Sequence, residues 1–300
     1  MASNFAEWQS VITRLAAFVV ALLLLPPLAL TLSGEEWVAS TPIAGAVWLP
    51  AIFSTFAVLA FGILLDTLTF QRTEHSLLRA QRGYVLWCGV AGAFTGVLFA
   101  YLNLFEGAWL TPASTESIAL LLAVFLGAAL LPVVLFTRLW LAGLLRLRTR
   151  RFALPALHAE ITAYILLLMA LGGLLGGTIW INHLGGLFWS SPLLLLVSLQ
   201  LFWNESSVFS GLPQGDWSRV LLGAVSGIVV GGLALTVYRI TGGALYFAAS
   251  AWQLSAYLAL FGLLCLQIGD VVAEHWRGKP RGEVFPKKPF PISVVVKKDR

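Results

Sequence analysis

Charged side chains are scarce in this sequence. Only 11% of its 300 residues are Asp, Glu, Lys or Arg, whereas 59% are hydrophobic, and the mean hydropathy is +0.87. Ordinary globular domains carry roughly 25% charged residues. A soluble fold of this length could not cover its surface with so few charges, whereas a bilayer favours apolar side chains on the surface that faces lipid. The composition therefore predicts an integral membrane protein.

Residues that carry metal, redox or hydrolytic chemistry are also few. Cys88 and Cys265 each stand alone in an apolar run, and no Lys precedes Lys279, which excludes a retinal Schiff base. HExxH, GxSxG, Walker A and DxxxD motifs are missing, which disfavours a conventional membrane hydrolase or ATPase. His158 and His183 fall at opposite ends of one predicted helix, which disfavours a bis-histidine haem. We predict no catalytic or metal-ligating residues and no cofactor carried by this chain, with the two cysteines as small packing residues.

Apolar runs long enough to cross a bilayer recur along the chain. A spanning helix needs roughly 20 residues at a rise of about 1.5 Å. Eight segments satisfy this: 12–32, 43–65, 84–105, 117–137, 159–181, 184–203, 219–238 and 244–268. They predict an all-α polytopic fold, with a transmembrane domain over 1–270 and a basic tail over 271–300. The spans divide into two groups of four near residue 155, which leaves open two four-helix bundles, although the residues show no convincing internal repeat.

The segment 184–203 is the least secure of these spans. It follows its predecessor after only Asn182 and His183. A re-entrant segment that returns to the same face is therefore the alternative. That alternative would exchange the sides on which all later loops lie.

Positive charge alternates along the predicted loops. With eight spans, 18 of the 19 Lys and Arg residues fall on one side, and Arg239 is left for the other. The positive-inside rule makes the basic side cytoplasmic. The pattern predicts a bacterial-type inner membrane protein with both termini in the cytoplasm. The basic loops and tail suit anionic lipid or other protein subunits, and no soluble domain presents the charges to nucleic acid.

Tryptophan and proline add two expectations. Amphipathic Trp rings suit the headgroup layer, so the tryptophans near predicted span ends are expected to be interfacial anchors. These are Trp37, Trp109, Trp140, Trp180, Trp189, Trp217 and Trp276. Pro50 removes a backbone donor and is expected to kink the second span.

Polar residues concentrate in the second half of the chain. His183 begins the tight connection between two spans, and its neutral ring could hydrogen-bond a quinone carbonyl, although a turn histidine satisfied by backbone is the plainer interpretation. Asn204 and Glu205 interrupt the apolar pattern on the other side, ahead of Asp216. They could line a pocket, contact a partner or form an ordinary polar loop.

Three short motifs in the second half carry a resemblance to a known family. They are His183-Leu184-Gly185, Asn204-Glu205 and Val237-Tyr238-Arg239. Residues 183–268 resemble the membrane-anchor subunits of the DMSO-reductase and polysulfide-reductase type, which are similar in length and span number. The resemblance implies quinol-oxidation roles for His183 and Glu205, with Asn204 and Arg239 as neighbouring ligand-binding candidates. The order of the motifs and the missing span between the last two differ from the family pattern.

Three functions are consistent with these observations. The first is an integral subunit of a multi-subunit membrane complex, including a quinone-contacting anchor of a respiratory oxidoreductase. The second is a transporter or flippase component for a small or lipidic substrate, with ion coupling disfavoured because carboxylates are missing from mid-span. The third is an enzyme that acts on lipid at the interface, where His158, Glu160, Glu205 and Asp216 are predicted to lie.

Overall fold

The computed structural model describes residues 49–74, 76–106, 109–110, 116–144, 158–179, 181–203, 207–243, 246–247 and 250–277. Within these ranges the chain is helical apart from one short antiparallel strand pair, β1 and β2, of two residues each. The predicted span 12–32 and the tail beyond Arg277 lie outside the described residues.

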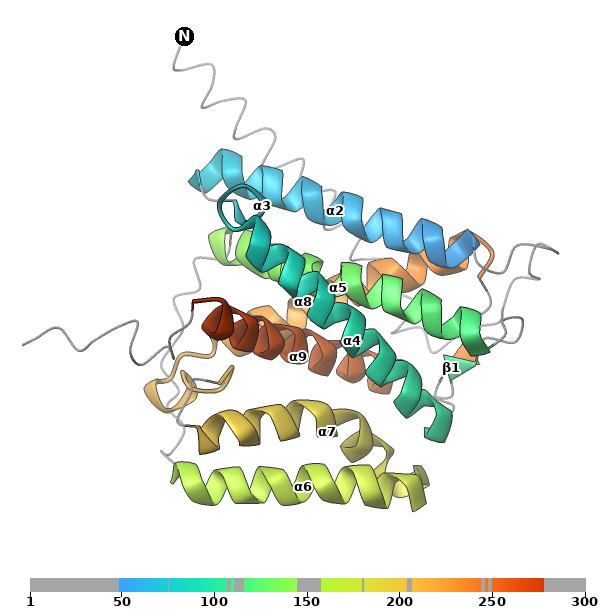
Figure 1. Ribbon diagram of the computed structural model, residues 1–300, viewed down its shortest axis with the longest axis vertical. Helices are drawn as coiled ribbons and strands as arrows, with labels where there is room; N and C mark the ends of the chain where they lie inside the picture. Colours follow the sequence, from blue (N-terminus) through green and yellow to red (C-terminus); the bar gives the residue numbers. More distant parts are fainter. Residues whose placement is uncertain are drawn as a thin grey trace, which may run out of the picture.

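Seven long helices make up the described part of the protein (Figure 1). They are α2 (Leu49–Thr73), α4 (Arg82–Glu106), α5 (Glu116–Leu144), α6 (Ala159–Ile179), α7 (Ile181–Phe202), α8 (Ser218–Ile240) and α9 (Ala251–Arg277). The short elements are α3 (Leu77–Ala80), the 3-10 helix η1 (Leu212–Gln214), β1 (Trp109–Leu110) and β2 (Tyr246–Phe247). Six helices are long and apolar enough to cross a membrane, and the described apolar stretch of α6 is shorter. The prediction of a helical multi-pass protein is confirmed for these six helices, and the total of eight stays a prediction.

Two local expectations can be compared with the described helices. Pro50 is the second described residue of α2, and the residues before Leu49 lie outside the described ranges, so the expected kink stays a prediction. The prolines inside described helices are Pro132 in α5 and Pro192 in α7. α7 is one continuous helix of 22 residues beside α6, so the described chain does not turn back on itself within 184–203.

Large apolar side chains cover the outside of the helices. Phe56, Phe94, Leu168 and Leu175 are each at least 66% exposed, and they come from α2, α4 and α6. Apolar patches of this extent are unusual on soluble monomers. The outward faces therefore match a lipid environment, as the composition predicts.

Helices from both halves of the chain share one core. α2 packs against α5 and α8, and α4 and α5 both pack against α9, while the α6–α7 hairpin joins this group mainly through α9 (Figure 1). The main cluster of buried side chains draws on α2, α4, α5, α7, α8 and α9. The described helices therefore do not separate into two independent four-helix bundles near residue 155.

The hairpins α4–α5 and α8–α9 pack through matching glycines. A Cβ placed on Gly127 of α5 would lie 2.9 Å from the Cα of Gly96 and would also collide with the carbonyl oxygen of Gly92. A Cβ placed on Gly262 of α9 would lie 2.7 Å from the Cα of Gly227 and would collide with the carbonyl oxygen of Gly223. The absence of a side chain lets the two backbones touch in both hairpins.

The same glycines sit in similar sequences. Residues 92–97 read GAFTGV and residues 223–228 read GAVSGI, and Thr95 and Ser226 in these segments each donate to the carbonyl oxygen four residues earlier. The loops that close the two hairpins pair with each other as antiparallel strands, with Trp109 opposite Phe247. This is the arrangement expected of two similar units related by a two-fold rotation. The structure thus reveals an internal repeat that the sequence analysis missed.

The helices define two ends of the bundle. α2, α5, α7 and α9 finish at one end, which we call the basic end, and α4, α6 and α8 begin there (Figure 1). Arg72, Arg79, Arg82 and Arg219 lie at the basic end, whereas Arg239 lies at the opposite end near the last turn of α8. The described residues thus follow the predicted alternation of charge, and the membrane side of each end stays a prediction.

Candidate functional site

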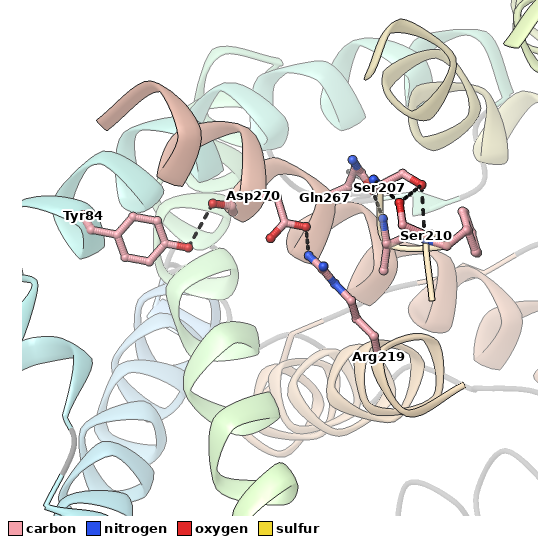
Figure 2. Close-up of polar contacts among 9 residues, drawn as sticks. Tyr84, Ser207, Ser210, Arg219, Gln267 and Asp270 are labelled. Carbon is pink, nitrogen blue, oxygen red and sulfur yellow. Dashed lines mark hydrogen bonds and ion pairs between the residues drawn. The ribbon is translucent and has the colours of Figure 1, made fainter. Parts of the chain in front are cut away.

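Polar contacts at the basic end tie α4, α8 and α9 together (Figure 2). Arg219, the second residue of α8, forms an ion pair with Asp270 of α9, and each side chain is 18% exposed. The Tyr84 hydroxyl on α4 donates to the Gly269 carbonyl oxygen at 3.0 Å, one residue before Asp270. Paired charges can be this far buried because each compensates the other. Three helices from both repeated units therefore meet at one polar site.

A compact loop between α7 and α8 packs against the same part of α9. The Val208 backbone N–H donates to Oε1 of Gln267 at 2.7 Å, and Ser207 N–H donates to Oγ of Ser210 at 2.7 Å (Figure 2). Gly215 adopts a left-handed conformation with φ of 77°, which favours glycine, and the chain then turns into α8. The loop is held by its own serines and by one glutamine of α9.

Asp216 closes this loop at its solvent side. Its Oδ1 accepts hydrogen bonds from the hydroxyl and, at 3.0 Å, the backbone N–H of Ser218. These bonds, with a smaller effect of Arg219, hold the pKa of Asp216 below its usual value, against a weak opposing effect of burial. Asp216 therefore satisfies the first backbone N–H of α8 from the residue before its N-cap.

A second buried carboxylate lies on α2. Asp66 is 6% exposed and accepts hydrogen bonds from the Ser76 hydroxyl and, at 3.0 Å, from the Leu77 backbone N–H. Ser76 in turn caps α3 by accepting from Arg79 N–H at 3.1 Å. Asp66 fixes the turn between α2 and α4, a structural role.

Two buried glutamines stand out because parts of their amides have no protein partner. Gln200 of α7 and Gln267 of α9 are both fully buried. Among the described residues, neither Oε1 nor Nε2 of Gln200 forms a hydrogen bond, and Nε2 of Gln267 does not either. A buried amide without partners costs about 1–3 kcal/mol. These two side chains are therefore the most unusual polar groups in the described core.

An aromatic cluster joins the α6–α7 hairpin to the core toward the opposite end. Trp189 of α7 stacks on Phe99 of α4 with ring centroids 5.7 Å apart, and it contacts Tyr257 of α9 at 6.2 Å. Trp189 is 6% exposed and Trp140 is 5% exposed. The prediction of interfacial anchoring is wrong for these two tryptophans, because both pack inside the bundle. The other five expected anchors include residues outside the described side chains.

The predicted site residues fall at different places. His183 is an exposed residue in the first turn of α7, at the opposite end, and Arg239 lies at that same end. Asn204 and Glu205 lie outside the described residues, after α7 has finished at the basic end. The whole length of α7 separates His183 from the point where the chain enters these two residues. The described structure thus gives no support for a shared site of His183 and Glu205.

The other chemistry-bearing residues show no assembled centre in the described ranges. His158 and Glu160 are exposed at the start of α6, and no three His, Cys, Asp or Glu side chains of the described chain converge as metal ligands. Cys88 and Cys265 are fully buried, as expected for packing residues. The sequence analysis missed Gln200 and Gln267 because it weighed only ionisable groups inside the spans. An amide within an apolar run was the signal that could have found them.

Comparison with protein-family models gives no match for this chain. Comparisons with curated proteins and with solved structures give no significant match either. The resemblance to reductase anchor subunits therefore gains no support from them and stays a prediction from three short motifs.

Proposed function

We propose that this chain is a non-catalytic subunit of a multi-subunit membrane complex in a bacterial-type inner membrane. The proposal rests on one contrast: helices pack tightly in the middle of the bundle, whereas polar groups gather at its basic end. Backbones touch in the middle of α4–α5 and of α8–α9, which closes these two interfaces to a substrate. Charged and hydroxyl groups gather instead at the basic end, beside the predicted cytoplasmic loops and tail.

The basic tail suits the docking of partner subunits. Residues 271–300 contain eight of the chain's Lys and Arg residues, and the first seven residues of this tail complete α9, which also carries Asp270 and Gln267. An acidic surface on a partner would complement this charge. A quinone-contacting role belongs to the same proposal, with His183 and Arg239 at the opposite end as candidates.

Purification from native membranes tests this proposal. The full chain should co-purify with defined partners, and a variant with all five lysines changed to glutamine should lose them while remaining folded. The lysines are Lys279, Lys287, Lys288, Lys297 and Lys298. A monodisperse, solitary monomer from gently solubilised membranes would count against a complex subunit.

The internal repeat favours transport as a second candidate. Repeats of parallel orientation, related by an axis along the membrane normal, are a common design of membrane transporters. The paired hairpins α4–α5 and α8–α9 fit that description. Movement of a small or lipidic substrate across liposomes that contain the purified chain would support this candidate, and its absence under every gradient would remove it.

A further inference from the structure

The buried glutamines Gln200 and Gln267 lie at the same depth in the bundle. Trp189 of α7 contacts Tyr257 of α9, and Val208, just after α7, contacts Gln267, so the two helices run in the same direction. Gln200 follows Trp189 by eleven residues in α7, and Gln267 follows Tyr257 by ten residues in α9. At helical rise these distances are about 16 Å and about 15 Å. The two amides are therefore level with each other.

Both amides also face the same cluster of buried side chains. Leu193, Val197 and Gln200 are spaced four and three residues apart, so they share one face of α7, and Leu264 and Gln267 share one face of α9. Leu193, Val197 and Leu264 belong to the main core cluster. α7 joins the other core helices chiefly through α9, and Gln267 accepts a hydrogen bond from Val208 just beyond α7, so helical periodicity places both glutamines toward the α7–α9 contact.

The repeated fold does not call for an amide at the position of Gln267. When Gly127 is matched to Gly262, Pro132 occupies the position of Gln267 in the first repeated unit. Packing can therefore be achieved without an unpartnered polar group. Gln267 therefore has no counterpart amide at the matching position of the first repeated unit.

We infer that Gln200 and Gln267 form a binding site for an uncharged carbonyl or hydroxyl group of a lipid-soluble molecule. The two amide groups offer N–H donors from both glutamines and one free acceptor, Oε1 of Gln200. A charged ligand would lose its hydration among apolar neighbours without an opposite charge to compensate it. A quinone headgroup and the ester carbonyl of a phospholipid both have the required chemistry.

This inference deepens the quinone-contacting part of the proposed function and moves its site from the exposed His183 to the core near the basic end. It does not depend on whether the chain has partner subunits. Loss of co-purification and loss of ligand binding are separate results, so either claim can fail alone.

Thermal unfolding of the full chain in lipid nanodiscs tests the site. A decyl-substituted benzoquinone is added to discs of ester-linked phospholipid and, separately, to discs of ether-linked phospholipid that lack the carbonyl groups. At about 100-fold above its Kd, a quinone that binds the folded state should raise Tm by several degrees. If the ester carbonyl is the natural ligand, the wild-type Tm should instead be higher in ester than in ether discs without added quinone.

The variant Gln200→Met separates binding from folding. Methionine has a similar volume and flexibility, and Gln200 makes no protein hydrogen bond within the described chain, so the fold should survive. The variant should abolish the shift that the wild type shows, whereas the control Gln253→Met, at the exposed start of α9, should retain it. The inference is overturned if neither quinone nor ester lipid shifts the wild-type Tm, or if Gln200→Met responds as the wild type does.

Discussion

At the scale of single residues, the Arg219–Asp270 ion pair shows how a local charge can join two helices. The pair links the start of α8 to the end of α9 where each side chain is 18% exposed. The matching positions in the first repeated unit are Cys88 and Leu135, so the same frame packs there without charge. Ion pairs of this kind are weak evidence for stability, but removing one partner leaves the other uncompensated.

The first prediction concerns this pair. Asp270→Asn or Arg219→Gln alone should each destabilise the folded chain by about 1–3 kcal/mol, because each leaves one half-buried charge without its partner. The double variant should cost less than the sum of the two. Thermal unfolding of the four proteins in one detergent measures the coupling, and strict additivity would show that the two side chains do not interact.

The second prediction concerns Asp216 and acid. Its pKa in the folded protein lies below its ordinary value of 3.8 because Ser218 donates two hydrogen bonds to the carboxylate. The resulting stabilisation is complete above the unfolded value and is lost as the pH falls through the folded pKa. Asp216→Asn should therefore lower Tm at neutral pH, and the difference from wild type should shrink below about pH 4.

A Tm difference that stays constant from neutral pH into strong acid would contradict this prediction. Ser218→Ala supplies a matched variant, since it removes the hydroxyl donor and retains the backbone N–H. It should show the same pH trend with a smaller amplitude.

Single residues also show where sequence reasoning succeeds. The burial of Cys88 and Cys265 and the isolation of Arg239 from the other described arginines follow from residue type and spacing. The burial of Trp189 could not be read in the same way, because it depends on contacts with Phe99 and Tyr257 from helices distant in sequence. Apolar periodicity predicts that a segment is helical, but it does not predict which other helices pack against it.

At the scale of elements, helix–helix contact rests on glycine. Gly262 and Gly127 occupy equivalent places in α9 and α5, where the neighbouring backbone leaves no space for a methyl group. The sequence analysis placed helices over most of the described spans but misjudged several ends. α9, for example, begins at Ala251 and reaches Arg277, whereas the apolar run predicted 244–268. Hydropathy cannot register polar turns that continue a helix past the bilayer.

The third prediction tests the glycine contacts. Gly262→Ala and Gly127→Ala should each destabilise the protein by about 1–3 kcal/mol, because the added methyl group must displace backbone. Gly172→Ala is the matched control, since nothing lies within 4 Å of its would-be Cβ. The control should be neutral or stabilising by about 0.5–1 kcal/mol. Equal Tm changes for Gly262→Ala and Gly172→Ala would refute the close approach of α8 and α9.

The fourth prediction tests the pairing of the two loops. Trp109 and Phe247 face each other in β1 and β2, and opposed residues of antiparallel strands have Cα atoms about 4.5–5.5 Å apart. This separation suits a disulfide. With Cys88 and Cys265 replaced by alanine, the pair Trp109→Cys and Phe247→Cys should cross-link on mild oxidation, as measured by peptide mass spectrometry.

The control for this experiment pairs Trp109→Cys with Ser210→Cys, which lies in the loop after α7, at the basic end of the bundle. It should not cross-link within one molecule. Equal yields from both pairs would show that the loops do not meet as the fold requires.

At the scale of the whole molecule, α8–α9 repeats the packing of α4–α5, so segments far apart in the sequence share one geometry. Span number predicted two groups of four helices, but two separate bundles are not found among the described helices, because α2 and α5 pack directly against α8. The motif GAFTGV at 92–97 and its counterpart GAVSGI at 223–228 are visible in the sequence. Three identical residues in six positions are a weak signal among ordinary membrane residues until the contacts of Gly127 and Gly262 reveal their shared geometry.

The account as a whole depends on the bundle crossing a membrane with its basic end in the cytoplasm. Ser210 is exposed at the basic end and Ile240 is 78% exposed at the opposite end. Both can be changed to cysteine in a chain whose Cys88 and Cys265 are replaced by alanine. These two positions report on the two sides directly.

Labelling with a membrane-impermeant maleimide is the most direct measurement. In cells with a permeable outer membrane and an intact inner membrane, Ile240→Cys should be labelled, and Ser210→Cys should be labelled after the inner membrane is opened. Labelling of both positions from the same side, or the reverse order, would contradict the proposed orientation and the spanning arrangement on which it rests.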